Sequence, residues 1–419
     1  MSPLAPECPP PALLDAARLR EDFPIFAHYE AQHGKPLTYL DNGATTHKPQ
    51  AVIDAISTFY SQSYGTVRRG VYALSEGATA AYHGVREQVA GFLNAPNAQH
   101  IIFTKGTTEA LNLVAHGFGW AMLNPGDRVV ITGMEHHANI VPWQQIAEKR
   151  QATVAAVPIR DDGTLDRDAL RALLAPPTKI LAITHVANSL GTINPIAEII
   201  AEAHAAGIPV LVDGAQGAPH MPVDVQALDC DFYCFSGHKL YGPTGIGVLS
   251  AKTEWLERMV PYQCGGDMID VVTLERTTFT APPHKFEAGT PPIAEVIGLG
   301  AALSYVTSVG MAAIDAHERA LLNEATQKLL AIDGLRIIGT APNKAGLVSF
   351  TIAGAHPLDL GTLLDQRGVA IRTGHHCAQP VMQRFGVTAT ARASFGLYNT
   401  PHDIDTLVDA IQGILPLLR

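Results

Sequence analysis

Short runs of apolar residues alternate with longer amphipathic stretches between residue 39 and about residue 261. The runs are too short for helices, and Gly or Pro follows several of them, so they indicate buried strands. Strands that alternate with helices predict an α/β fold, in which helices flank a mainly parallel sheet. The seven strands expected in this sheet are Ile101–Thr104, Arg128–Thr132, Thr153–Pro158, Ile180–Thr184, Pro209–Val212, Phe232–Phe235 and Gly247–Ser250.

The pattern changes after residues 259–292, where frequent Gly and Pro predict an irregular connection. Two long helices and several short strands follow, so a smaller α+β domain is expected. Its expected elements are the helices 293–309 and 312–332, the strands 335–338, 348–352 and 369–372, and a closing helix 402–417. We therefore predict a large domain over residues 37–292 and a small domain over residues 293–419.

One lysine stands just after a strand, in the segment Ser236–Leu240 that follows Phe232–Phe235. Burying an ammonium group costs free energy unless its pKa falls or the amine is used chemically. A lysine with a lowered pKa can form a Schiff base with a carbonyl cofactor. Taken alone, Lys239 is more often a solvated lysine, so this interpretation depends on its neighbours.

Two further strand ends carry suitable neighbours. The run Ile208–Val212 ends in Asp213, at the strand end where open α/β sheets bind ligands. Pyridoxal phosphate needs an acid beside its pyridine nitrogen, because the protonated ring accepts electrons, and Asp213 is a candidate for this acid. The alternative interpretation of Asp213 is a helix N-cap. Gly106, Thr107 and Thr108 precede an amphipathic stretch, and the N–H groups of a helix start bind phosphate, although an ordinary capped helix looks the same. Together these strand ends favour a pyridoxal phosphate site.

A cysteine near the C-terminus lies in the segment Arg372–Ala378 together with two histidines. Positive neighbours lower the pKa of a thiol, so Cys377 is a candidate thiolate. The alternatives are a small core cysteine and a metal site formed by His375, His376 and Cys377. Adjacent ligands in one short run seldom close a tetrahedral site, and the chain has no Cys-x-x-Cys motif, so no metal is expected.

These motifs, in this order, resemble the group II cysteine desulfurases of the class V aminotransferase family. The resemblance extends from about Leu37 to the C-terminus and rests on Tyr39–Ala44, Arg69–Gly70, Gly106–Glu109, Glu135–Asn139, Asp213–Gln216, Ser236–Pro243, Glu287–Thr290 and Arg372–Cys377. The last motif separates group II from group I, in which the cysteine lies on a longer loop. The resemblance implies a pyridoxal phosphate enzyme of fold type I. Such an enzyme converts L-cysteine to L-alanine and leaves a persulfide on Cys377.

The resemblance also implies a role for each site residue. Lys239 binds the cofactor and moves the Cα proton, while His136 stacks on the cofactor ring and completes the catalytic set. The remaining cofactor-binding residues are Asp213 at the ring nitrogen, Gln216 at the ring oxygen, and Thr107, Thr108, Ser236, His238 and Thr290 at the phosphate. The substrate-binding residues are Arg392 at the carboxylate, assisted by Asn188 and Arg372.

The resemblance implies partners as well. Thr290 matches a threonine that reaches the phosphate of the other subunit, so a homodimer is expected. A Suf-type sulfur acceptor that serves iron–sulfur cluster assembly is the expected protein partner.

Residues 1–36 are expected to pack with the small domain, with residues 1–11 disordered, Leu13–Arg20 helical and Phe23–Phe26 an extended docking segment.

Two positions depart from the family pattern. Arg68 stands where the family has a histidine, so we expect a changed charge at the mouth of the site. Cys264 replaces a glycine, and we expect a small buried residue in preference to a second functional thiol.

Composition limits the other classes of function. A formal net charge of −10 and the lack of a basic block argue against nucleic-acid binding, and no apolar run is long enough to span a membrane. Five cysteines, an odd number, fit reduced thiols in the cytoplasm. The alternatives left open are a selenocysteine lyase or a cysteine Cβ-lyase on the same scaffold. The intact Lys239, Asp213 and Cys377 argue against a non-catalytic sulfur carrier, and a metal-binding protein is the third alternative, which the spacing of the ligands disfavours.

Overall fold

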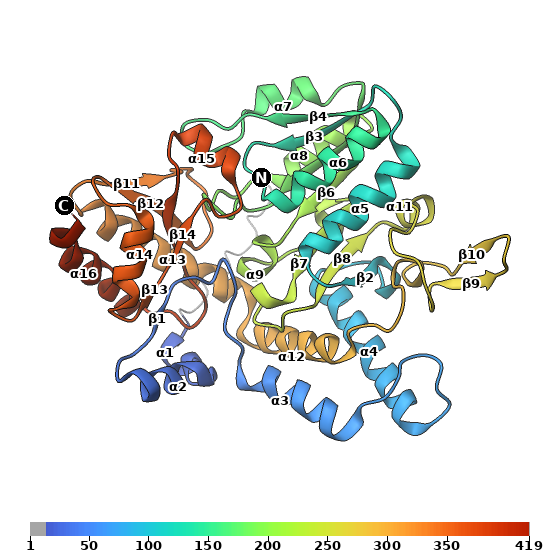
Figure 1. The fold of residues 1–419 in the computed structure, drawn as a ribbon, viewed down its shortest axis with the longest axis horizontal. Coiled ribbons are helices and arrows are strands. Elements are labelled where there is room, and N and C mark those ends of the chain that lie inside the picture. Colours follow the sequence, from blue (N-terminus) through green and yellow to red (C-terminus); the bar gives the residue numbers. More distant parts are fainter. Residues whose placement is uncertain (1–13, 419) are drawn as a thin grey trace, which may run out of the picture.

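The larger sheet has seven strands in the order β2-β8-β7-β6-β5-β3-β4 (Figure 1). In this computed structural model, which describes residues 14–418, the five strands from β7 to β4 are parallel, and β8 runs antiparallel to both β7 and β2. The strands are β2 (Ile101–Thr104), β3 (Arg128–Thr132), β4 (Thr153–Val157), β5 (Thr178–Thr184), β6 (Val210–Asp213), β7 (Phe232–Ser236) and β8 (Gly247–Ala251). The predicted α/β class and mainly parallel seven-stranded sheet are confirmed.

Helices cover both faces of this sheet, which explains why its strands are almost wholly apolar. Along β7, Phe232 and Cys234 pack into one core, and Tyr233 and Phe235 pack into the other, because successive side chains of a strand point to opposite faces. The first core includes α5 (Thr107–Met122), α6 (Val141–Arg150) and α11 (Thr253–Arg258). The second includes α4 (Ala73–Phe92), α8 (Ile196–Ala205) and α12 (Ile293–Val309).

The smaller sheet has four antiparallel strands in the order β11-β12-β15-β14. Its strands are β11 (Leu335–Ile338), β12 (Leu347–Ile352), β14 (Arg372–Gly374) and β15 (Thr390–Ser394), and the helices that share its core are α13 (Met311–Leu330), α14 (Pro357–Asp365) and α16 (Pro401–Leu418). Strand β15 is one that the pattern of apolar residues did not predict. The single strand predicted over 369–372 is two strands, because β13 (Val369–Ala370) pairs with β1 (Thr38–Tyr39) whereas β14 pairs with β15.

The N-terminal segment forms two helices, α1 (Ala16–Arg20) and α2 (Pro24–His33). The prediction of an extended segment over Phe23–Phe26 is wrong beyond Phe23, because proline is favoured in the first helical turn, where its missing N–H is not needed. Phe23 packs edge-on against the ring of Tyr398, with centroids 4.7 Å apart. Arg20 lies 3.7 Å from Asp403 of α16. The segment thus contacts the C-terminal part of the chain, while the domain boundaries stay a prediction.

Part of the irregular connection predicted over 259–292 is an exposed antiparallel hairpin, which projects from the body of the molecule (Figure 1). The hairpin consists of β9 (Ile269–Val272) and β10 (Thr277–Phe279), and the remaining helices are α3 (Gln50–Thr58), α7 (Arg167–Leu173), α9 (Gly217–His220), α10 (Val225–Leu228) and α15 (Gln379–Phe385). Among residues 14–418, no helix by itself has the length and apolar character to cross a membrane. Only α12 and α13 taken together meet these criteria, and they meet at a 73° bend.

The predictions for residues 1–11 and for Leu13 concern positions outside the described residues. The other helices predicted in the C-terminal part agree with α12, α13 and α16 to within about two residues at each end.

Candidate active site

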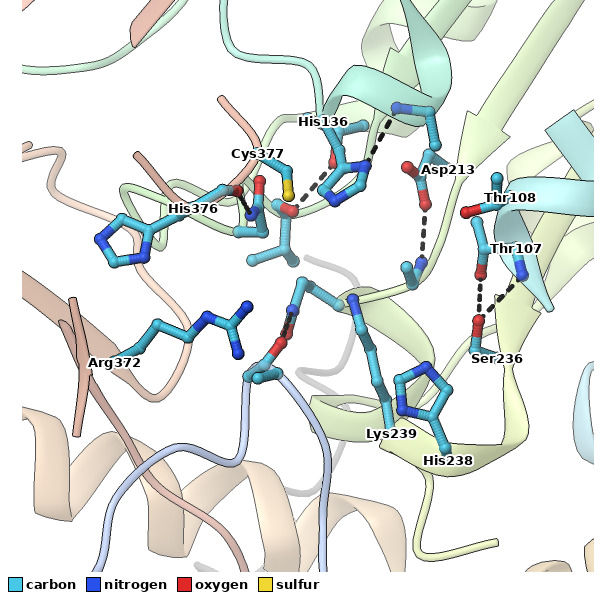
Figure 2. Close-up of a pocket in the computed structure, with 18 of the residues that line it drawn as sticks. Thr107, Thr108, His136, Asp213, Ser236, His238, Lys239, Arg372, His376 and Cys377 are labelled. Carbon is cyan, nitrogen blue, oxygen red and sulfur yellow. Dashed lines mark hydrogen bonds between the residues drawn. The ribbon is translucent and has the colours of Figure 1, made fainter. Parts of the chain in front are cut away.

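A cavity of about 220 Å³ lies beside the carboxyl ends of β6 and β7, where open α/β sheets place their ligands (Figure 2). The predicted site residues that line it are Lys239, Cys377, His136, Asp213, Gln216, Thr107, Thr108, Ser236, His238, Arg392, Asn188 and Arg372. These residues come from both sheets and from the loops around them. Thr290 is the one predicted site residue that the cavity does not include.

Lys239 and Asp213 lie on neighbouring parallel strands of the large sheet. Asp213 is the last residue of β6, and Lys239 ends a short 3-10 turn that follows β7. Asp213 is only 3% exposed, and burial raises its pKa, although the Ala215 N–H, 2.9 Å from Oδ1, acts in the opposite direction. Burial lowers the pKa of Lys239 to about 8, partly offset by the charge of Asp213. The amine is therefore available as a nucleophile near neutral pH.

The start of α5 forms the far end of the cavity. Both the backbone N–H and the hydroxyl of Thr107 contact the Ser236 hydroxyl oxygen at 2.8 Å, which joins this helix to the end of β7 (Figure 2). A Cβ atom on Gly247 would lie 2.4 Å from the Gly106 Cα, so the close approach of β8 to this loop requires glycine. The positive end of a 16-residue helix attracts anions, and the threonine hydroxyls add donors.

Two histidines of the cavity are neutral at pH 7. Burial lowers the pKa of His136 to about 4, and its Nδ1 accepts a hydrogen bond from the Ala138 N–H at 3.0 Å. The ring proton of His136 therefore sits on Nε2, which is a hydrogen-bond donor. Burial likewise lowers the pKa of His238 to about 4, and its Nδ1 lies 3.2 Å from the Thr45 hydroxyl. Neither ring brings a positive charge to the site.

Gln216 is held by a buried series of hydrogen bonds that the sequence did not predict. Its Nε2 donates to the Gly43 carbonyl at 2.6 Å, and its Oε1 lies 3.1 Å from Nε2 of His220. Nδ1 of His220 lies 2.5 Å from Oε2 of Glu318, a residue of α13. Nothing in the local sequence indicates this hydrogen-bond series, because its members come from different parts of the fold.

Arg392 is buried on β15, with a side chain that is 2% exposed. Its Nη1 donates to the Asn188 carbonyl at 2.7 Å, and its Nη2 donates to Asp41 at 3.2 Å. Arg372 lies 3.6 Å from the other oxygen of Asp41. Two guanidinium groups thus share one carboxylate, which leaves net positive charge for an anionic ligand. Asp41 lies in the motif Tyr39–Ala44, but its contact with Arg392 could not be predicted from the sequence, because the two residues are 351 positions apart.

The Cys377 loop is held in an unusual backbone conformation. His376 and Cys377 have φ angles of 52° and 54°, the left-handed region that residues other than glycine seldom adopt. Asn188 donates to the His376 carbonyl at 2.6 Å, and the His376 ring bonds to the Thr390 hydroxyl at 2.7 Å. The half-buried Cys377 is thereby placed at the cavity wall, across from Lys239 (Figure 2).

The prediction that His376 contributes positive charge beside Cys377 is wrong. The residue is 6% exposed, and burial, with the charges of Arg392 and Arg372, lowers its pKa to about 3. His376 is therefore neutral at pH 7, and Arg372 and Arg392 are the arginines whose positive charges line the cavity together with Cys377.

Three other residues lie outside this cavity. Thr290 lines a separate cavity of about 90 Å³. Arg68 forms a 2.7 Å ion pair with the buried Glu287, which Arg86 also binds at 2.7 Å. Arg68 thus lies outside the cavity of its own chain, and one carboxylate shared by two arginines leaves net positive charge at this cluster. The expected change of charge at the mouth of the site stays a prediction. Cys264 is exposed, which contradicts the expectation of a buried residue.

The cavity fits a phosphorylated carbonyl cofactor with a basic ring nitrogen. The close approach of glycine backbones at the start of α5 leaves a cradle for a phosphate, and Asp213 supplies an acid at a strand end. Lys239, which lines the same cavity, supplies an amine of lowered pKa. Fold and site together therefore define an α/β enzyme built around pyridoxal phosphate.

The chain belongs to the aminotransferase class-V family, which matches residues 38–407. It is 52% identical over 402 residues to a cysteine desulfurase of Dickeya dadantii, a match that covers 96% of this chain and 97% of the relative. It is 48% identical to a probable cysteine desulfurase of Streptomyces coelicolor, with 96% and 98% covered. The crystal structure of the cysteine desulfurase CsdA from Escherichia coli superposes with a TM-score of 0.90 at 43% identity, covering 97% of this chain and all of CsdA.

Proposed function

We propose that this protein is a pyridoxal phosphate-dependent cysteine desulfurase. It converts L-cysteine to L-alanine and retains the sulfur as a persulfide on Cys377. The observation that carries the proposal is that Cys377 and Lys239 line the same cavity, so that a thiol and an amine can reach one small substrate. Relatives with this activity in their names, which cover nearly the whole chain, support it.

Substrate binding follows from the charges around the cavity. Arg392 and Arg372 bind the carboxylate of L-cysteine, and the contacts of Arg392 with Asn188 and Asp41 hold its guanidinium plane in place. A planar, two-pronged donor fixes the direction of the Cα–H bond of the substrate. The bound cofactor supplies an electron-accepting ring that stabilises negative charge at Cα.

Lys239 and Asp213 then perform the proton chemistry. Lys239 would hold the cofactor, and its amine takes the proton from Cα of the substrate and later returns it. Asp213 would bind the protonated ring nitrogen, and the Ala215 N–H orients its carboxylate. His136, neutral and with its proton on Nε2, donates a hydrogen bond toward the cavity.

The sulfur step belongs to Cys377. Its thiolate attacks the substrate sulfur, so that an S–S bond forms while the bond from sulfur to Cβ breaks. The three-carbon fragment keeps that electron pair, takes up a proton at Cβ and leaves as L-alanine. A Cβ-lyase that releases sulfide directly needs no thiol facing the substrate, so the position of Cys377 favours sulfur transfer. The names of the relatives do not favour selenocysteine lyase as the main activity.

A sulfur-consuming partner completes this cycle. The persulfide passes to an acceptor protein of the Suf type for iron–sulfur cluster assembly in the cytoplasm. The half-buried Cys377 keeps part of its surface accessible, which such a transfer requires.

Product and persulfide analysis tests the proposed function. The holoenzyme is incubated with L-cysteine and without reductant, and alanine is counted while mass spectrometry locates added sulfur. We expect one alanine for each sulfur added in the first turnover, with that sulfur on Cys377. Added sulfur on Cys264 or Cys234 with Cys377 unmodified would contradict the mechanism.

The active unit is a homodimer in which Thr290 of one chain completes the phosphate site of the other. Within this chain Thr290 lies outside the active-site cavity, in agreement with a role in the second chain. Mixing the inactive variants Lys239→Ala and Thr290→Ala should restore activity, because mixed dimers contain one complete site. Full activity of a monomeric chain would refute the shared site.

A further inference from the structure

The structure brings a third metal-ligating side chain to the cysteine loop. One ligand atom each from His137, His375 and Cys377 lies within 4.8 Å of the other two. His137 begins a short 3-10 turn after β3, some 240 positions before Cys377 in the chain. This group differs from the run His375–Cys377 that the sequence offers, because the buried His376 points its ring to Thr390 instead.

Backbone contacts hold these three residues together. The His137 N–H donates to the Cys377 carbonyl at 2.8 Å, and Nε2 of His137 accepts from the Gln379 N–H at 3.1 Å. Nδ1 of His375 accepts from the Cys377 N–H at 3.1 Å. The two segments therefore meet without a metal, so that binding need not bring distant chain segments together.

The ligand types and spacing suit one class of ion. Zinc binds thiolate and imidazole at about 2.3 and 2.0 Å, so two ligand atoms on one tetrahedral ion are about 3.5 Å apart. The ligand atoms of the exposed His375 and the half-buried His137 and Cys377 lie within 4.8 Å of one another, so each pair must approach by at most about 1.3 Å to reach this spacing. A ring nitrogen that now accepts a backbone N–H gives up a neutral hydrogen bond in exchange for a stronger metal bond.

We propose that His137, His375 and Cys377 form a binding site for a zinc-class divalent cation at the mouth of the active-site cavity. Three protein ligands leave the fourth tetrahedral position open to water or to a substrate thiolate. On binding, the Cys377 thiol loses its proton to solvent, and its sulfur becomes a metal ligand. The ion is an inhibitor of the enzyme rather than its cofactor.

The inhibition rests on the proposed function, because a sulfur held by zinc is not free to attack the substrate. The binding itself does not depend on that function. Metal binding is therefore measured first, without cysteine, so that a failed metal site and a failed desulfurase assignment can be told apart.

The experiment titrates metal-free holoenzyme with Zn²⁺ in competition with a chromophoric chelator. We expect one Zn²⁺ per chain, bound at least tenfold more weakly after each of the substitutions His137→Gln, His375→Ala and Cys377→Ser. His28→Ala and Cys264→Ser are matched controls, since they remove an exposed imidazole and an exposed thiol elsewhere, and they should leave this affinity unchanged. Mg²⁺, which prefers oxygen ligands, should not compete.

A second readout covers variants that fold poorly. The absorption of the bound cofactor reports an intact fold, and only variants that retain it are compared. Zn²⁺ should also inhibit cysteine turnover by the wild-type enzyme, with recovery on adding a chelator, and His375→Ala should weaken this inhibition. The site is refuted if no saturable binding occurs, if none of the three substitutions weakens it, or if Mg²⁺ binds equally well.

Discussion

The two ends of the cavity are carried by different kinds of structure: the cofactor end, with Lys239 and Asp213, and the sulfur end, with Cys377. Lys239 and Asp213 follow buried parallel strands of a seven-stranded sheet with helices on both faces. Cys377 lies on a loop between the three-residue strand β14 and the seven-residue helix α15, with positive φ angles and a few hydrogen bonds to hold it. The cofactor-binding groups are thus set on buried strands, whereas the half-buried thiol is set on a loop, the kind of segment that is generally more mobile than the elements it connects.

Replacing Lys239 should abolish the chemistry of the cofactor end. We expect Lys239→Ala to lower alanine production by at least about three orders of magnitude and to abolish the visible absorption of the lysine-linked cofactor. Lys252→Ala is a matched control, since Lys252 follows the neighbouring strand β8 but pairs with Asp229 at 2.6 Å. Turnover near the wild-type rate in Lys239→Ala would show that another group holds the cofactor.

Replacing the cysteine should separate the two ends. In Cys377→Ser we expect the cofactor absorption and its change on adding L-cysteine to remain, because Lys239, Asp213 and Arg392 are intact. Persulfide formation and alanine production should fall by at least about a hundredfold. Cys264→Ser, which removes an exposed thiol outside the cavity, should behave like the wild type. Loss of the cofactor absorption in Cys377→Ser would mean that the two ends are not independent.

The lowered pKa of Lys239 predicts a smaller effect, a pH dependence of cofactor binding at the cofactor end. Only the neutral amine reacts with the cofactor, and its pKa of about 8 means that the neutral fraction rises with pH and levels off above pH 8. The rate of reloading the cofactor-free enzyme should therefore rise about tenfold from pH 7 to pH 9.

The control for this measurement is Asp213→Asn. Asp213 raises the pKa of Lys239, so its removal should move the plateau to lower pH. A reloading rate that still rises steeply above pH 9 would show an ordinary, solvated lysine.

The smallest effect is expected at the support of the cysteine loop. His376 holds this loop through Thr390, so His376→Phe should lower the rate of persulfide formation severalfold without changing the cofactor absorption. Thr390→Val breaks the same contact from the other side, and combining both changes should cost little more than either alone. Additive losses would indicate that the contact does not position Cys377.

The sequence by itself determined the elements and most of the chemistry. Apolar runs and their glycine and proline ends predicted all seven strands of the large sheet, because a buried strand must be apolar on both sides. The strand-end motifs predicted that Lys239, Asp213 and Thr107 share one cavity, since the carboxyl ends of parallel strands meet at one edge of a sheet. The family resemblance supplied residues such as Arg392 and Asn188.

The tertiary structure alone decided which distant groups meet and which of them carry charge. It placed Asp41 against Arg392, Glu318 behind His220, and His137 beside Cys377, and no local periodicity specifies contacts between segments so far apart. It also made His376 neutral, whereas the sequence suggested a cation. A pKa depends on burial and on neighbours in space, and only the folded chain supplies these.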